Sequence, residues 1–130
     1  MKLLTANLRQ ILPPLYTQEK TEDPLIHVKF FTPDGSWTWY ATEGSYIDRH
    51  GTAMEYWDPQ RSSPADAVDF LFFGYVMGQF EEWGYFTLSE LETARGPLGL
   101  PIERDLYFQP GPFSQVIATE PRRANTRKPE

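Results

Sequence analysis

The sequence predicts an α+β domain: a four-stranded antiparallel sheet in two hairpins with helices packed on one face, in the order α-β-β-β-β-α. Three observations lead to this fold. One stretch has the apolar spacing of a helix, four stretches have the composition of strands, and capping residues indicate a second helix. The chain has 130 residues, of which 15% are aromatic, so a single domain over residues 1–119 can bury a substantial core.

The first helix is predicted near the N-terminus, where apolar residues recur at positions 4, 8, 11 and 12 along one helical stripe. Thr5 is the expected N-cap, because its side chain can accept a hydrogen bond from the first turn. Pro13 and Pro14 end this helix, since proline restricts the residue before it. The stretch TQEKTEDP that follows reads as a polar connector.

A first hairpin is predicted around the segment KFFTPDGSWTWYATEGS, which begins at Lys29. Residues 26–31 and 37–42 alternate between two faces, and the TPDG sequence between them is typical of a type I turn with a bulge, with a positive φ at Gly35. Both faces of the second strand carry rings. We expect Trp39 to lie in the core, whereas Trp37, beside the turn, could serve the core or an interface.

A second hairpin is predicted after a long loop. Residues 44–68 lack a sustained period and contain turn formers throughout, so we expect a loop there. The apolar run DFLFFGYVM at residues 69–77 reads as a buried strand, and QFEEWGYF at residues 79–86 reads as its partner. Gly74 interrupts the apolar run, which indicates a bulge or a close approach of two backbones.

A helix over residues 88–95 has the clearest local signature. Thr87 and Glu90 are spaced as a capping box, and Phe86 and Leu91 occupy the two positions of a hydrophobic staple. The Gly-Pro pair that follows supplies the stop. After it we expect a short extended piece and a brief closing helix, at residues 105–108 and 113–117.

Three long motifs in these elements resemble one bacterial family. They are KFFTPDGSWTWYATEGS, VDFLFFGYVMG and GYFTLSELETARGPLGLPIERDLYF. With the opening MKLLTANLRQILPPLY, they are similar to the family of unknown function DUF2958, from Leu3 to about Phe113. The chain departs from the family's pattern at Glu81-Glu82-Trp83, where an acidic-aliphatic pair is typical, and in the loop after Ser45.

The resemblance implies a cellular setting but no chemistry. Members of this family are similar to small accessory products of plasmids and integrative elements, encoded near replication, transfer and anti-restriction genes. Related domains also occur attached to larger proteins of such elements. Because no activity is attached to the family, the resemblance implies no catalytic residue for this chain.

The composition limits the compartment. Without cysteine there can be no disulfide framework, thiolate metal site or cysteine nucleophile, and no run of 18 apolar residues is present to span a membrane. The opening segment lacks the pattern of a signal peptide, because polar residues interrupt its apolar run and no small-residue cleavage site follows. We therefore expect a soluble cytoplasmic protein.

The net charge of −6 is unevenly distributed. Residues 1–119 carry 16 acidic and 8 basic residues. The tail at residues 120–130 carries 2 acidic and 4 basic residues and two prolines, and it is expected to be disordered. An acidic body repels the phosphate backbone, so nucleic-acid binding by the body is disfavoured, although the basic tail could contact anions.

Two groups of charged residues have both a structural and a functional interpretation. Several carboxylates near the predicted loop could hold a hard cation, or they could be a solvated charged loop, since they lack the spacing of a calcium site. They are Glu43, Asp48, Glu55, Asp58, Asp66 and Asp69. Glu103-Arg104-Asp105 could form an ion-pair latch, or Arg104 could receive an anionic ligand or a partner's acidic side chain.

The sequence predicts no catalytic, cofactor-binding or metal-binding residue and no cofactor. No motif places a nucleophile or a metal-ligand set beside His27 or His50, and the glycines after residue 95 follow a helix instead of forming a phosphate loop. An enzyme of unknown type stays open as a third hypothesis. It rests on a pocket that would be formed by Trp39, Glu43, Glu103 and Arg104.

The favoured function is protein binding by a non-enzymatic accessory protein of a mobile genetic element. Rings interleaved with acids are more typical of a protein interface than of a surface that stacks on bases, although a helix on one side of the sheet and the long loop on the other could bury most of them. The partner would have a basic surface, and one version inhibits a host defence or DNA-binding protein. The alternative is a single-stranded nucleic-acid module using the basic tail and the aromatic loop. The candidate interaction surface comprises Glu43, Tyr56, Trp57, Asp58, Glu81, Glu82 and Arg104.

Overall fold

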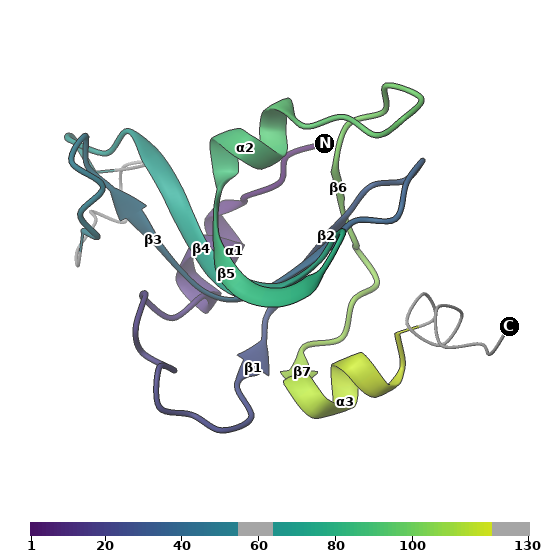
Figure 1. The fold of residues 1–130 in the computed structure, drawn as a ribbon. Coiled ribbons are helices and arrows are strands. Elements are labelled where there is room, and N and C mark those ends of the chain that lie inside the picture. Colours follow the sequence, from purple (N-terminus) through teal and green to yellow (C-terminus); the bar gives the residue numbers. More distant parts are fainter. Residues whose placement is uncertain (55–63, 121–130) are drawn as a thin grey trace, which may run out of the picture.

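The computed structural model describes residues 1–54 and 64–120, and its main feature is a curved five-stranded antiparallel sheet in the order β5-β4-β3-β2-β6 (Figure 1). The strands of this sheet are β2 (Val28–Phe31), β3 (Thr38–Ile47), β4 (Asp69–Met77), β5 (Glu81–Thr87) and β6 (Glu103–Arg104). A second sheet pairs β1 (Leu25–Ile26) with β7 (Gly111–Pro112). The helices are α1 (Ala6–Ile11), α2 (Leu88–Thr93) and α3 (Phe113–Ala118).

Both predicted hairpins are confirmed, and the mixed helix–sheet class is confirmed with them. β2 pairs with β3 and β4 pairs with β5, and the pairing of β3 with β4 joins the hairpins into one sheet. The predicted number of four strands is wrong, because β6 pairs with β2 as a fifth. A strand of two residues cannot display an alternating pattern, so it leaves no periodic signal in the sequence.

A β-bulge in β3 interrupts its pairing with β4. The register shifts between Ala41 and Glu43, so Thr42 is the extra residue. Opposite the bulge, a Cβ on Gly74 would lie 1.8 Å from the carbonyl oxygen of Tyr40, which confirms the close backbone approach predicted there. Regular alternation would place Tyr40 and Glu43 on opposite faces of the sheet. The extra residue shifts the alternation, so both side chains lie on the same face.

Helices α1 and α2 close the other face, where the main core lies (Figure 1). Ring contacts run through this core: the centroid of the Phe72 ring on β4 lies 5.4 Å from that of Phe30 on β2 and 5.0 Å from that of Phe70 on the same strand. Trp39 belongs to this core, as predicted, and Trp37 stacks on it while staying 41% exposed. The buried members are Leu3, Leu4, Leu12, Val28, Phe30, Trp39, Ala41, Phe70, Phe72, Phe86, Leu91 and Ile102.

The predicted helix starts are confirmed. The Thr5 hydroxyl accepts a hydrogen bond from the backbone N–H of Leu8 at 3.2 Å. At α2, the Thr87 side chain accepts the N–H of Glu90 at 3.1 Å, and the Glu90 carboxylate accepts the N–H of Thr87 at 2.8 Å. Both helices are therefore fixed at their N-termini by residues adjacent in sequence, which is why local patterns were sufficient to find them.

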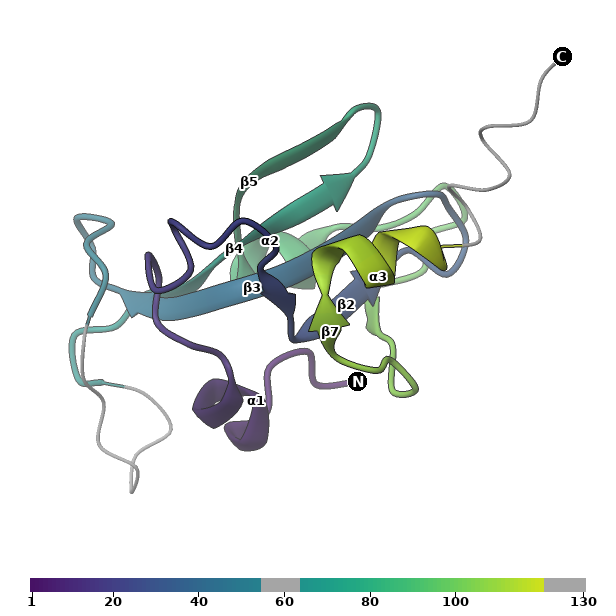
Figure 2. The same ribbon diagram turned by 90° about the horizontal axis from the view of Figure 1, so that it is seen from below.

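Helix α3 covers the opposite face of the sheet, beside β1 and β7 (Figure 1, Figure 2). A smaller core lies beneath it, built from Ile26, Tyr40, Met77 and Val116. The prediction that helices pack on one face only is therefore wrong. The sequence predicts α3 correctly as a brief closing helix, but its apolar side chains do not show which face of the sheet they contact.

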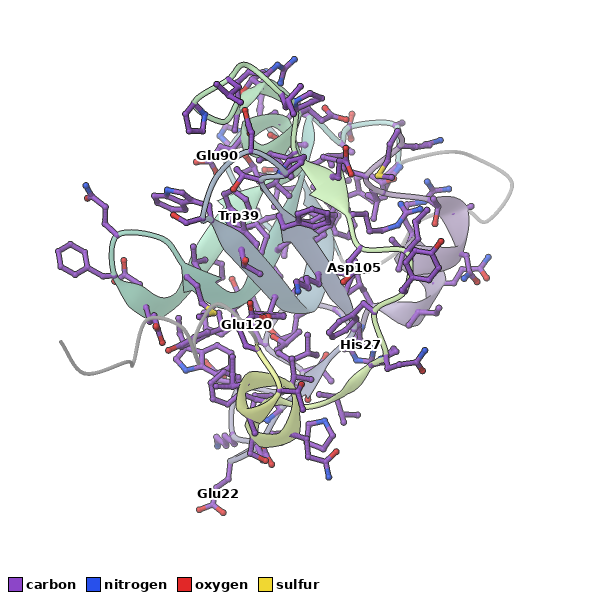
Figure 3. All side chains as sticks on the ribbon, turned by 90° about the vertical axis from the view of Figure 1, so that its right-hand side faces the viewer. Glu22, His27, Trp39, Glu90, Asp105 and Glu120 are labelled. Atoms are coloured by element: carbon purple, nitrogen blue, oxygen red, sulfur yellow. The ribbon has the colours of Figure 1, made fainter. Side chains whose placement is uncertain are left out.

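Charged groups border this smaller core. The Tyr40 hydroxyl donates a hydrogen bond to the carboxylate of Glu120, which also lies 3.5 Å from Lys29 Nζ. Glu120 is the first residue of the predicted tail, and it is buried. Figure 3 shows Glu120 and Trp39 on opposite sides of the sheet, in agreement with the two separate cores.

The strand boundaries of the first hairpin differ from the prediction at both ends. Residues 44–47, predicted as loop, continue β3. The predicted strand over residues 26–31 is divided at His27. The backbone N–H of His27 still donates to the Ala41 carbonyl of β3 at 2.9 Å, whereas β1, just before it, pairs with β7. A strand that changes partner keeps its alternation, which hides the division from a sequence pattern.

Two turns also differ from expectation. Gly35 has no positive φ; among the glycines of residues 1–54 and 64–120, only Gly51 and Gly99 do. The extended piece predicted at residues 105–108 contains a turn, and the strand lies just before it, in β6. Each helix in these two ranges has six residues, too few to cross a bilayer.

Candidate functional site: an aromatic cleft

A cleft of about 340 Å³ opens on the face of the sheet that carries α3. Its size lies at the lower end of the roughly 300–1,000 Å³ typical of ligand pockets. One wall is the segment between α1 and β1, which crosses β3 (Figure 2), and the other is formed by β4 and β5. We call it the aromatic cleft; it is lined by Tyr16, Gln18, Glu19, Thr21, Glu22, Pro24, Thr42, Glu43, Phe73, Trp83 and Tyr85.

Backbone hydrogen bonds fix the segment wall to β3. The carboxylate of Glu43 accepts the N–H of Tyr16 at 2.9 Å through one oxygen and the N–H of Gln18 through the other. The Ser45 hydroxyl accepts the N–H of Leu15 at 2.9 Å. Glu43, only 3% exposed, therefore acts as a clamp between the bulge in β3 and a segment far away in sequence.

Tyr16 sits on this wall in an unusual backbone conformation. Its φ is 75°, in the left-handed region that residues other than glycine rarely adopt, and it is the only such residue within the described ranges. A conformation of this kind costs about 1–3 kcal/mol and persists where surrounding contacts fix it. The hydrogen bond to Glu43 is one such contact, and the result is that the Tyr16 ring lines the cleft.

Three rings on neighbouring strands form the opposite wall. Phe73 and Trp83 are nearly parallel, at 12° with centroids 5.9 Å apart, and Tyr85 meets Phe73 edge-on at 4.9 Å. Trp83 also packs on Phe113 of α3, with centroids 4.8 Å apart. These contacts hold the rings in place, yet Trp83 is 37% exposed and Tyr85 54% exposed. The wall is thus an ordered aromatic surface in contact with solvent.

The charge of the aromatic cleft is negative. Glu19, Glu22 and Glu43 line it, and no lysine, arginine or histidine is among the described residues that line it. Burial, and then nearby groups that include Glu43 and Glu19, raise the pKa of Tyr85 above its usual value of 10.0. Burial disfavours a charge of either sign, whereas the part of this shift that comes from Glu43 and Glu19 reflects negative charge that would attract a cation.

Comparison with known families agrees with the sequence motifs. The model of the family described as "Protein of unknown function (DUF2958)" matches residues 3–125. The chain belongs to this family. No curated protein and no solved structure matches the chain, so the chemistry of the cleft has to be inferred from its own residues.

This DUF2958 protein places the predicted interaction residues in different environments. Glu43 is buried under the segment wall and is not part of an exposed surface, because its carboxylate is occupied by backbone donors. Glu81 and Glu82 are exposed at the start of β5, where Glu81 accepts a hydrogen bond from the Tyr75 hydroxyl at 3.0 Å. Three further predicted residues lie outside the described residues: Tyr56, Trp57 and Asp58.

Arg104 holds the N-terminal residues of the chain. Its guanidinium group donates hydrogen bonds to the backbone carbonyls of Lys2 and Leu3, the latter at 3.1 Å. The predicted ion-pair latch does not form at Arg104, because within the described residues its guanidinium group binds carbonyl oxygens and not a carboxylate. The carboxylate of Asp105 lies 3.8 Å from Nζ of Lys29 on β2, a partner outside the predicted latch.

The acidic residues assigned to one loop do not gather in the described ranges. Asp48 accepts backbone hydrogen bonds within its own turn, whereas Asp69 accepts hydrogen bonds from the backbone and hydroxyl of Ser89 at the start of α2. Residues 1–54 and 64–120 contain no group of three or more ligating side chains that could hold a metal ion. Two members of the set lie outside these ranges: Glu55 and Asp58.

The enzyme pocket predicted from Trp39, Glu43, Glu103 and Arg104 does not form. Trp39 faces the core beneath α1 and α2, whereas the bulge directs Glu43 to the opposite face, where it lines the aromatic cleft. In a strand with regular alternation, residues 39 and 43 would share one face of the sheet. One extra residue in that strand is enough to separate the two side chains.

Half of the aromatic cleft was missed from the sequence. The sequence predicts a strand that includes Trp83 and Tyr85, but it predicts only a polar connector at Gln18, Glu19 and Glu22. Their contacts to β3 are long-range, so no local pattern marks them. The available signal was Glu43 itself, because an acidic residue inside a buried strand requires hydrogen-bond donors from elsewhere.

Proposed function

We propose that this protein is a non-enzymatic accessory protein that acts by binding another protein at the aromatic cleft and its acidic rim. The observation that carries the proposal is the combination of exposed, ordered rings with carboxylates and no cation among the described lining residues. Trp and Tyr are the side chains most enriched in binding hot spots, since they contribute large contact areas with few rotatable bonds. Rings held in place by neighbours lose little further entropy on binding.

The charge of the cleft supports a partner with a basic surface. Complementary charge accelerates association and disfavours wrong partners, and the effect weakens as salt rises. Proteins that bind nucleic acid present basic surfaces of this kind. The proposal therefore includes, as its narrower version, inhibition of a host defence protein or another DNA-binding protein through its basic surface.

The setting of the proposed role is a mobile genetic element. Its support is the likeness, drawn from the sequence motifs, to accessory products of plasmids and integrative elements. A protein that arrives with such an element gains from blocking host proteins that act on incoming DNA. The narrower version and the proposed setting are consistent with each other in this respect.

The experiment that tests protein binding is a comparison of variants in a capture assay. The immobilised protein is exposed to bacterial lysate at low and high salt, and captured proteins are identified by mass spectrometry. We expect a partner that Tyr85→Ala and Trp83→Ala no longer retain and that high salt releases. Tyr107→Ala is the matched control, because Tyr107 is 89% exposed and does not line the cleft.

Two outcomes would contradict the proposal. One is a partner that all three variants retain equally, because the cleft would then not be the binding surface. The other is the absence of any partner together with tight binding of single-stranded oligonucleotides. If that binding were lost on deletion of residues 120–130, the nucleic-acid alternative would replace protein binding.

A further inference from the structure

We infer that the aromatic cleft receives the guanidinium group of an arginine side chain presented by the protein partner. This inference rests on the proposed function and specifies the chemistry of its ligand. Three properties of the cleft lead to it: the flat ring surface on β4 and β5, the carboxylates on the facing segment, and the absence of a competing cation among the described residues that line the cleft.

The ring surface suits a planar cation. The planes of Phe73 and Trp83 differ by 12°, both residues line the cleft, and Trp83 is 37% exposed. A cation above the face of a ring is attracted by the negative charge of the π-system, and tryptophan is the strongest partner. A guanidinium group is planar and more weakly hydrated than an ammonium group, so it stacks on such a face at a smaller cost in lost hydration.

The facing segment supplies negative charge at two depths. Glu19 and Glu22 are exposed at the rim, and Figure 3 shows Glu22 extending away from the body of the molecule. Within the described part of the chain, neither carboxylate forms an ion pair. Glu43 also lines the cleft but is buried, so it contributes negative charge beneath the rim carboxylates.

The positions of the walls also favour a side chain that enters from outside. The Glu43 clamp fixes the segment wall, and the contact of Trp83 with Phe113 of α3 fixes the ring wall. Both walls are therefore formed before a ligand arrives. A long side chain with a charged end can reach between such walls while its backbone stays on the surface.

The test is a titration of the full-length protein with three synthetic peptides of Gly/Ser composition. One carries arginines, and the other two carry lysine or neutral citrulline at the same positions. Isothermal titration calorimetry is expected to give binding of the arginine peptide that is about tenfold tighter than that of the citrulline peptide and about threefold tighter than that of the lysine peptide.

Variants assign the binding to the cleft. Trp83→Ala and the double change Glu19→Gln/Glu22→Gln should each lower the affinity for the arginine peptide by about tenfold. The matched control is Asp66→Asn/Glu92→Gln, which removes the same charge from exposed residues that do not line the cleft and should leave the affinity unchanged. Since Glu19 and Glu22 are exposed, their double variant is expected to fold even if Trp83→Ala does not.

Equal affinity for the arginine and citrulline peptides, or for the arginine and lysine peptides, would overturn the inference. So would equal weakening by the cleft and control double variants, because binding would then follow net charge alone. If a protein partner is captured through Trp83 and Tyr85 while no peptide binds, the arginine pocket is rejected and the protein-binding function stands. If the arginine peptide binds with the expected preference and no partner is captured, the arginine pocket stands and the protein-binding function is rejected.

Discussion

The two faces of the sheet differ in how completely they are covered, and two consecutive residues of β4 make the difference clear. Phe72 points to the face closed by α1 and α2 and is 0% exposed. Phe73 points to the face shared by α3 and the aromatic cleft, where its ring neighbours Trp83 and Tyr85 stay in contact with solvent. The same residue type therefore serves the core in one position and a binding surface in the next.

This difference indicates that one face of the sheet mainly stabilises the fold and the other mainly offers a binding surface. The closed face buries its rings in the main core, whereas the open face holds its rings by contacts with each other and leaves Trp83 and Tyr85 in contact with solvent. Exposed apolar rings can promote aggregation. The contacts of these rings with each other and with α3 hold them in fixed positions. The changes below test this division, beginning with the largest expected effect.

Removal of the Phe72 ring should have the largest effect on stability. Phe72→Ala leaves a cavity between Phe30, Phe70 and Phe86, and we expect the free energy of unfolding to fall by about 3–5 kcal/mol. Urea denaturation followed by circular dichroism measures the loss. Phe73→Ala is the matched change on the open face and should cost clearly less; equal losses would contradict the division between the faces.

The Glu43 clamp connects the two regions, so its loss should have an intermediate effect. In Glu43→Gln, the amide group faces one backbone N–H that previously met a carboxylate oxygen, and we expect a loss of about 2 kcal/mol. Hydrogen exchange should accelerate at the amides of Tyr16 and Gln18 more than at those of β4. Unchanged protection at these two amides would show that other contacts hold the segment wall.

Removal of a ring from the open face should change stability little. Tyr85 is 54% exposed and makes one edge contact with Phe73, so Tyr85→Ala is expected to lower the free energy of unfolding by about 1 kcal/mol or less. Thermal unfolding monitored by circular dichroism gives the comparison with Phe72→Ala. A loss as large as that of Phe72→Ala would mean that the open face is part of the folding core.

The smallest effect concerns the junction at His27, where the chain passes from β1 to β2. Burial lowers the pKa of this imidazole below its usual value of 6.5, because the charged form loses hydration. Between the two pKa values the unfolded chain binds more protons, so stability should fall as the pH drops below about 6.5 and level off below the folded pKa. His27→Gln should flatten this part of the pH profile; an identical slope in the variant would assign the dependence to another group.

The features found correctly from the sequence are those that depend on neighbouring residues. The capping box at Thr87 and Glu90, the N-cap at Thr5 and the two hairpins each need only a few adjacent positions, and all are present. Gly74 was recognised for the same reason, since a glycine within an apolar strand has few explanations. Local chemistry therefore sufficed for most of the main sheet and for the helix starts.

The features missed depend on contacts between distant residues. β6 and the pair β1–β7 have two residues per strand, too few for a period, and α3 carries no mark of the face it covers. The aromatic cleft joins the connector around Gln18 to β3 through Glu43 and to rings on β5. Of the predicted interaction residues with described positions, only Glu43 lines the cleft, and it does so as a buried clamp.

Because Thr42 is the extra residue of the bulge, this chain should tolerate a substitution at position 42 better than a deletion. A substitution there alters one side chain, whereas an in-frame deletion of its codon would turn every later residue of β3 over. Glu43 and Ser45 would then face the phenylalanines, and Tyr46 would leave its contact with Phe70. Among natural variants of this chain, we therefore expect residue 42 to be substituted far more often than it is deleted.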